Sequence, residues 1–191
     1  MPSLSKPPRV LALVGMPGSG KTLCARHLEE QGFYQFRFGG IVEDEVRRRG
    51  LPVKPDNERV VREEFRTNEG MDAIARRALP YLHQALEKRG SIVIDGLYSF
   101  SEYKTLNAEF GKAMILVAIV AERVLRYERL SNRPVRPLTH QEAELRDWQE
   151  IETLEKGGPI AIADYTLLNN DAADVLLAAL DRLTTVLQIT P

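Results

Sequence analysis

The sequence predicts an α/β fold in which helices cover both faces of a parallel sheet. Short apolar runs alternate with helical patterns along most of the chain. The runs at 9–15, 91–95 and 113–120 contain almost no polar residues, as is typical of strands buried on both faces. A glycine-rich loop joins the first run to a helical pattern, which is the strand–loop–helix unit from which such folds are built.

The first half of the chain is divided by its apolar runs and glycines. A strand over 9–15 precedes a helix over 21–31, which Gly32 ends. The aromatic-rich run at 33–38 is predicted to form a second strand. Three further helices are expected over 41–49, 56–68 and 71–89, with glycine stop signals at Gly50, Gly70 and Gly90.

The second half continues the alternation. Strands are expected over 91–95, 113–120 and 165–169, with helices over 101–110, 122–132, 139–155 and 172–188. Thr139 and Glu142 form a T-x-x-E capping box at the start of the third of these helices. Asp171 is the predicted N-cap of the last helix.

Length and composition predict a single domain over 1–191 with a flexible tail at 1–8. The formal net charge of −1 argues against a general affinity for nucleic acid or anionic membranes. The single cysteine excludes a disulfide within the chain, and the histidines lack metal-ligand spacing. The opening "MPSLSKPP" has no apolar core of a signal peptide, and no apolar run is long enough to span a bilayer. We therefore expect a cytoplasmic protein, either a monomer or a homodimer.

The segment "GMPGSGKT" at 15–22 matches G-x-x-x-x-G-K-[ST] after an apolar strand and before a helix. Its glycines allow backbone N–H groups to approach phosphate oxygens, and the helix N-terminus adds further donors. Lys21 is expected to reach the β- and γ-phosphates, and the Thr22 hydroxyl to ligate Mg²⁺. The residues predicted to hold a nucleoside triphosphate are Gly15, Pro17, Gly18, Ser19, Gly20, Lys21 and Thr22.

Asp95 ends the apolar strand "SIVID" and is followed by Gly96. A carboxylate in this place commonly supports Mg²⁺ beside a phosphate-binding loop. The carboxyl ends of parallel strands meet at one edge of the sheet, where open α/β sheets bind ligands. Asp95 is therefore predicted either to support the metal or to act as a base, although strands also end in aspartate for turn reasons.

The segment "ERVLRYERLSNRPVR" at 122–136 places Arg126, Arg129 and Arg133 three and four residues apart, on one helix face. Cationic side chains stabilise the charge that develops on a transferring phosphoryl group. We predict that Arg129 and Arg133 contact phosphate. The alternative is a solvated face whose arginines pair with Glu122 and Glu128.

Other charged residues lie between the second and third strands. Arg62 and Arg66 are four residues apart and could face a cleft, but Glu63 and Glu69 are equally ready to pair with them. Glu43 and Asp44, after the second strand, are weaker candidates for acceptor recognition.

Together these segments resemble the nucleotide-kinase branch of P-loop proteins, which includes adenylate kinase and dephospho-coenzyme A kinase. The resemblance is strongest to small dephospho-coenzyme-A-kinase-like proteins that are largely uncharacterised. It runs from 10 to about 171 through "GMPGSGKT", "EGMDAIARRALPYL", "IVIDGLYS", "RYERLSNR", "ELRDWQEIE" and "ADYTLLNND".

The resemblance implies a three-layer P-loop NTPase fold with five parallel strands in the order 2-3-1-4-5. It also implies an acceptor-side helical region near 40–88 and a short lid near 133–140. By the same analogy Arg129 and Arg133 are lid-side arginines, Arg146 follows the lid, and Asn169 lies near the adenine.

The chain departs from adenylate kinases in two places that bind the acceptor phosphate. Gly40 and Glu43 replace the aspartate and arginine of the G-D-x-x-R stretch, and Tyr98 stands where an arginine follows D-G. These differences argue against a plain AMP kinase. The chain matches the acceptor motifs of dephospho-coenzyme A kinase only at "ADYTLLNN", which argues against that enzyme as well.

The sequence thus favours an ATP-dependent phosphotransferase that transfers the γ-phosphoryl group of Mg·ATP to a small, nucleotide-like acceptor. Lys21, Asp95, Arg129 and Arg133 are its predicted catalytic residues. An ATP-binding regulator, or slow NTPase that acts through a protein partner, remains the alternative. A nucleic-acid enzyme is less favoured because no basic and aromatic residues are interleaved. The sequence does not name the acceptor or decide between ATP and GTP.

Overall fold

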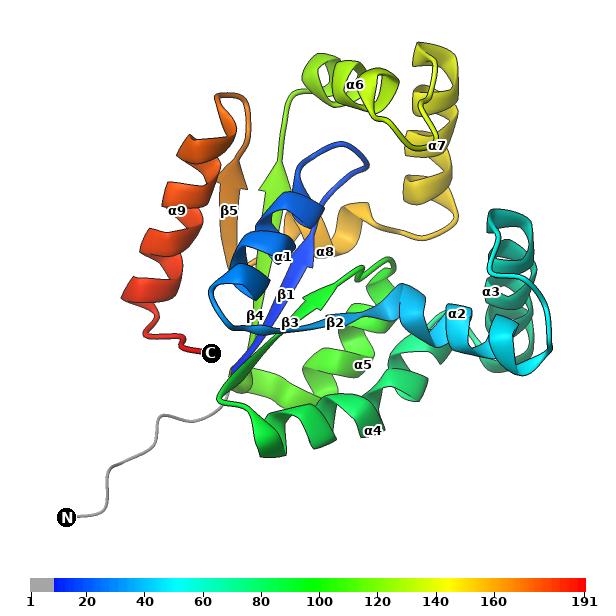
Figure 1. Cartoon of the computed structure of the whole chain (residues 1–191), viewed down its shortest axis with the longest axis horizontal. Coiled ribbons are helices and arrows are strands. Elements are labelled where there is room, and N and C mark those ends of the chain that lie inside the picture. Colours follow the sequence, from blue (N-terminus) through cyan, green and yellow to red (C-terminus); the bar gives the residue numbers. More distant parts are fainter. Residues whose placement is uncertain (1–8) are drawn as a thin grey trace.

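A computed structural model describes residues 9–191, and its core is a five-stranded parallel sheet (Figure 1). The strands are ordered β2-β3-β1-β4-β5 across the sheet, and every neighbouring pair is parallel. This confirms the predicted α/β fold and strand order. The strands are β1 (Arg9–Val14), β2 (Tyr34–Arg37), β3 (Ser91–Asp95), β4 (Met114–Val120) and β5 (Tyr165–Leu168).

The helices agree with the predicted ranges to within a few residues, apart from one that was not predicted. They are α1 (Lys21–Glu30), α2 (Phe38–Arg48), α3 (Pro55–Glu69), α4 (Ala73–Lys88), α5 (Phe100–Phe110), α6 (Arg123–Asn132), α7 (His140–Glu152), α8 (Gly157–Ala161) and α9 (Ala173–Val186). The additional helix is α8. Its sequence, GGPIA, is too short and too rich in glycine and proline for a helical period to be visible.

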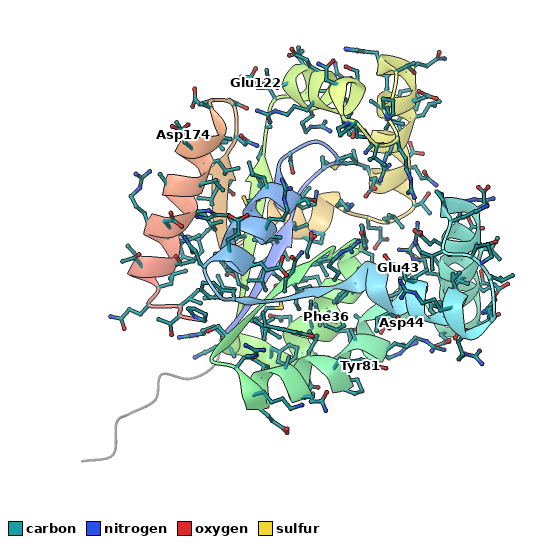
Figure 2. The ribbon with its side chains drawn as sticks, in the orientation of Figure 1. Phe36, Glu43, Asp44, Tyr81, Glu122 and Asp174 are labelled. Atoms are coloured by element: carbon teal, nitrogen blue, oxygen red, sulfur yellow. The ribbon has the colours of Figure 1, made fainter. Side chains whose placement is uncertain are left out.

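Alternate residues of β1 pack against the two helical layers. Leu11 and Leu13 lie in a core with α1 and α9 on one face of the sheet. Val10 and Ala12 lie in the larger core that α4, α5 and α8 cover on the other face. At the β2 edge the rings of Phe36 and Tyr81 stack at 6.3 Å, which ties α4 to the edge strand (Figure 2).

The functional elements gather beyond the carboxyl ends of the strands. The loop after β1 lies there together with α6 and α7, whereas α2 and α3 project from the β2 edge (Figure 1). The carboxyl ends of the strands are the edge at which an open parallel sheet is expected to bind ligands.

The helix α5 begins with a capping box that was not predicted. The side chain of Ser99 caps the helix, and Glu102 completes the box.

Two predictions about helix caps had different outcomes. The capping box of Thr139 and Glu142 is present at the start of α7, which confirms that prediction. The prediction for Asp171 was wrong, because the N-cap of α9 is Ala172 and no side chain caps it. The chain remains extended for one residue longer than predicted, with ψ of 151° at Ala172, so α9 starts too late for Asp171 to cap it.

The predicted tail at 1–8 lies outside the described residues. Within residues 9–191, no helix combines the length and apolar character needed to cross a bilayer.

Candidate functional site

The loop between β1 and α1 packs tightly against neighbouring elements. At Gly18 the φ angle is +78°, and a Cβ atom would lie 2.6 Å from the carbonyl oxygen of Arg126. At Gly20 the φ angle is +107°, and a Cβ atom would lie 2.3 Å from Nδ2 of Asn169. Both positions therefore require glycine, for backbone conformation and for space.

Lys21, the first residue of α1, folds back over this loop. Its Nζ atom donates hydrogen bonds to the carbonyl oxygens of Gly15 at 2.6 Å and Met16 at 3.1 Å. Burial, together with the positive charge of Lys156, lowers the pKa of Lys21 to about 7. An ammonium group so poorly solvated lacks a strong counter-anion, which a phosphate group would supply.

The loop also offers unused polar groups. Among residues 9–191, the buried hydroxyl of Ser19 has no hydrogen-bond partner. The N-cap of α1 is Gly20, and no side chain caps the helix, so its first N–H groups remain available. An orphaned hydroxyl, free N–H groups and a desolvated lysine together fit the phosphates of a nucleotide.

A cavity of about 490 Å³, here called the phosphate cavity, opens beside the loop. Lys21, Thr22 and Asp95 all line it, so the structure brings these predicted site residues together. Asp95 accepts a hydrogen bond from Nε2 of Gln35 at 3.1 Å, and burial raises the pKa of its carboxyl group. The Thr22 hydroxyl and the Asp95 carboxylate are oxygen donors of the kind that Mg²⁺ prefers.

The two predicted lid-side arginines line a second cavity of about 600 Å³, here called the side cavity. Arg129 has a buried Nη1 atom without a partner among the described residues. Arg133 lines both cavities, and burial lowers its pKa. Neither arginine forms an ion pair with Glu122 or Glu128 in the described part of the chain. The pairing with Glu122 and Glu128 that the alternative requires is therefore absent from the described residues.

Arg126 does not share the environment of Arg129 and Arg133. Its guanidinium group is buried, donates to the Pro17 carbonyl oxygen at 3.0 Å, and binds both oxygens of the Asp147 carboxylate. Asp147 also accepts a hydrogen bond from the Tyr127 hydroxyl at 3.2 Å. Arg126 therefore joins the phosphate loop to α6 and α7 and holds them in place.

Asn169, predicted to lie near the adenine, braces the loop from the β5 side. Its side chain is buried, and Nδ2 donates to the Ser19 carbonyl oxygen at 2.8 Å. Asn169 also lines the side cavity with Asp171 and Ala173. Placement of an adenine there stays a prediction.

Sequence reasoning missed a buried charge pair on the far wall of the phosphate cavity. Lys156, in the loop before α8, forms an ion pair with Glu150 of α7. Its Nζ atom also lies 4.8 Å from the centre of the Tyr98 ring. All of these residues line the cavity, as does Arg146, whose Nε lies 3.7 Å from Glu150. Lys156 lies in no recognisable motif, so its place in the cavity could not be predicted from the sequence.

The chain is similar in sequence to a known domain family and to several archaeal proteins. The AAA domain family matches residues 11–163. A UPF0200 protein from Thermococcus gammatolerans is 35% identical over 168 residues, which cover 86% of this chain and 88% of that protein. The chain belongs to the UPF0200 family. A second relative in the family, from Thermococcus kodakarensis, is 34% identical over 91% of this chain and 95% of its own length.

This UPF0200 protein is also similar in fold to several solved structures. TT1252 from Thermus thermophilus has a TM-score of 0.68 at 16% identity, covering 95% of this chain and 99% of that chain. Shikimate kinase from Bacteroides thetaiotaomicron has a TM-score of 0.59 at 16% identity with the same coverage. A gluconokinase from Sinorhizobium meliloti has a TM-score of 0.53 at 17% identity and covers 95% and 96%. The chain therefore has a P-loop, kinase-like fold.

The acceptor-side region of this UPF0200 protein differs from the sequence expectation at α2. Figure 2 shows Glu43 and Asp44 on α2. They pair with Arg47 at 3.1 Å and 2.7 Å and line neither the phosphate cavity nor the side cavity. Arg62 and Arg66 of α3 instead line a third cavity, between α3 and α7. Arg62 and Arg66 therefore face a cleft, as the sequence allowed, whereas Glu43 and Asp44 are occupied in ion pairs on α2.

Proposed function

We propose that this UPF0200 protein is an ATP-dependent phosphotransferase that transfers the γ-phosphoryl group of Mg·ATP to a small acceptor. A nucleotide-like acceptor is the expectation carried over from the sequence. The observation that carries the proposal is the convergence of Lys21, Thr22 and Asp95 on one cavity. Arg133 and Arg146 line the same cavity. A phosphate-binding loop and additional cations around one space suit phosphoryl transfer.

In this proposal the chain contributes positioning and charge. Loop N–H groups and Lys21 hold the β- and γ-phosphates in line with the acceptor. An acceptor oxygen forms a bond to the γ-phosphorus while the bond from that phosphorus to the β,γ-bridging oxygen breaks. ADP departs with the electron pair, and Asp95 accepts the proton of an acceptor hydroxyl group. Arg129 and Arg133 stabilise the charge on the transferring group.

Thr22 and Asp95 would hold Mg²⁺, directly or through a water molecule. The ion would neutralise charge on the phosphate oxygens and fix their orientation. Burial raises the pKa of the Asp95 carboxyl group, which makes this carboxylate a better acceptor for the proton of the acceptor hydroxyl group.

The solved neighbours support a small acceptor. Shikimate kinase and gluconokinase are named for small hydroxylated acids, and each covers 95% of this chain in the structural comparison. At 16% and 17% identity, this likeness supports the reaction class without identifying the acceptor.

The experiment is a coupled assay of ADP formation with Mg·ATP. The panel comprises nucleoside monophosphates, nucleosides, dephospho-coenzyme A, shikimate, gluconate and small sugars. We expect ADP formation to rise strongly with one group of acceptors and to be lost in Lys21→Met, whereas the exposed control Lys112→Met keeps it. Equal ADP release with and without every acceptor would replace the kinase by a slow NTPase acting as a regulator.

A further inference from the structure

Arg66 of α3 carries two buried donors that nothing in the described residues uses. Its Nε and Nη2 atoms are buried and have no hydrogen-bond partner within residues 9–191. The Nε–H and Nη2–H bonds of a guanidinium group point in the same direction and form a fork. That fork matches two oxygens of a carboxylate or phosphate group. The two unpartnered donors of Arg66 therefore have the geometry needed to bind an oxyanion.

The fork belongs to a cavity that adjoins the phosphate cavity. This arginine groove has a volume of about 650 Å³ and lies between α3 and α7, with Arg62, Arg66, Arg136 and Arg146 among its lining residues. Arg146 and Glu150 line both the arginine groove and the phosphate cavity. A molecule in the groove would therefore reach toward the place proposed for phosphoryl transfer.

The acidic residues three positions before and after Arg66 in α3 are engaged elsewhere. Glu63 pairs with Arg59 at 3.3 Å, and Glu69 pairs with Arg77 at 2.6 Å. Arg62, Arg66 and Arg136 form no ion pair in the part of the chain that the structure describes, and neither do the acidic lining residues Glu58 and Glu142. Glu142 is bound to Thr139 in the capping box of α7. Three unpaired cations against two unpaired carboxylates leave the groove with an excess of one positive charge, which favours an anion.

Among the acidic residues, Glu102 has the largest electrostatic effect on Arg66, but it accepts no hydrogen bond from the Nε or Nη2 atom of Arg66. Its Oε2 atom accepts the N–H groups of Tyr98 at 2.7 Å and Ser99 at 3.1 Å. Its buried Oε1 atom has no partner among the described residues. Burial raises the pKa of Glu102 to about 7, so near neutral pH its carboxyl group is only partly charged. It therefore opposes an incoming anion only weakly.

We propose that the Nε/Nη2 fork of Arg66 binds an oxyanion, either a carboxylate or a phosphate, carried by the acceptor. Arg62 and Arg146 line the same groove and add positive charge around it. This inference rests on the proposed function and restricts its acceptor to an anionic molecule. It also supplies acceptor contacts in place of those missing at Gly40, Glu43 and Tyr98.

The test reads the Arg66 Nε–H group by NMR in ¹⁵N-labelled protein. Mg²⁺ and a non-hydrolysable ATP analogue first saturate the phosphate loop, so that added anions do not bind there. The Arg66 resonance is assigned by its loss in Arg66→Lys. Acetate, inorganic phosphate and neutral acetamide are then titrated separately. We expect the Arg66 resonance to shift and saturate with at least one anion, while Arg59, which lines the same groove but is paired, does not respond.

The outcomes separate the two ligand chemistries and can overturn the proposal. Saturation by acetate alone assigns a carboxylate, saturation by phosphate alone assigns a phosphate, and saturation by both supports a general oxyanion fork. No response to either anion, or an equal response to acetamide, overturns the proposal. The donors of Arg66 would then be hydrogen-bonded to water. This readout needs no turnover, so it remains valid if the proposed kinase activity fails.

A kinetic test follows once the panel yields an acceptor. Loss of a charge-assisted pair of hydrogen bonds is expected to raise the acceptor KM of Arg66→Met by about 10- to 100-fold. The KM for ATP is expected to stay unchanged. The matched control Arg59→Met, on the same helix and groove, is expected to stay within about twofold of the parent. Equal acceptor KM values for Arg66→Met and the parent would overturn the proposal while leaving the kinase activity intact.

Discussion

Binding of Mg·ATP at pH 8 is expected to take up almost one proton from solvent. Burial and the nearby charge of Lys156 lower the pKa of Lys21 to about 7 in the empty site. At pH 8 only about a tenth of the molecules then carry a charged Lys21. The phosphates supply the missing counter-charge, so binding raises the pKa of Lys21 toward its ordinary value of 10.5.

The size of this effect follows from the two pKa values. The expected uptake is about 0.9 proton per Mg·ATP at pH 8 and about 0.1 at pH 6, where Lys21 is already protonated. Isothermal titration calorimetry in buffers of different ionisation enthalpy measures it. In Lys156→Met the pKa of Lys21 loses one of its lowering influences, so uptake at pH 8 is expected to fall.

The exposed control Lys112→Met is expected to match the parent in this experiment. A proton uptake at pH 8 no larger than that at pH 6 would show instead that Lys21 is already charged before the nucleotide binds, despite its burial.

Other perturbations address the elements that support the site. Asp147→Asn leaves the buried Arg126 guanidinium without its charge partner and is expected to lower the free energy of unfolding by about 3–5 kcal/mol, as measured by urea denaturation. A loss below about 1 kcal/mol would contradict a structural role for this pair. Asn169→Ala removes the hydrogen bond to a loop carbonyl oxygen and is expected to cost about 1–3 kcal/mol and to weaken ATP binding; unchanged ATP affinity would argue against the bracing role. Arg129→Ala and Arg133→Ala are expected to lower turnover at saturating ATP by about 10²–10³-fold, with little change in ATP affinity. Turnover within twofold of the parent for both would remove them from the transfer step.

The sheet could be predicted from local sequence because its signals are strong. The runs that form β1, β3 and β4 are buried almost throughout, and continuous apolar runs bounded by turn residues are typical of such strands. The phosphate loop could also be predicted, because its glycines and Lys21 have a fixed spacing. These features depend on residues close together in the chain.

The remaining features depend on contacts between residues far apart in the chain. Arg126 and Arg129 look alike in sequence, but Asp147, 21 residues beyond Arg126, draws only Arg126 into a buried pair. Lys156 likewise joins the phosphate cavity only because α7 and the loop before α8 return to it. The unpaired state of Arg66 could not be predicted from the sequence, because it depends on Glu63 pairing with Arg59 and Glu69 pairing with Arg77.

The proposed function depends on binding of the phosphates of Mg·ATP by the loop at 15–22. Calorimetric titration of Mg·ATP into the parent, Lys21→Met and Lys112→Met measures this binding. We expect saturable binding to the parent and to Lys112→Met, with an affinity of Lys21→Met that is weaker by about 100-fold or more. Equal affinity of the parent and Lys21→Met for Mg·ATP, or no binding to any of the three proteins, would contradict this expectation.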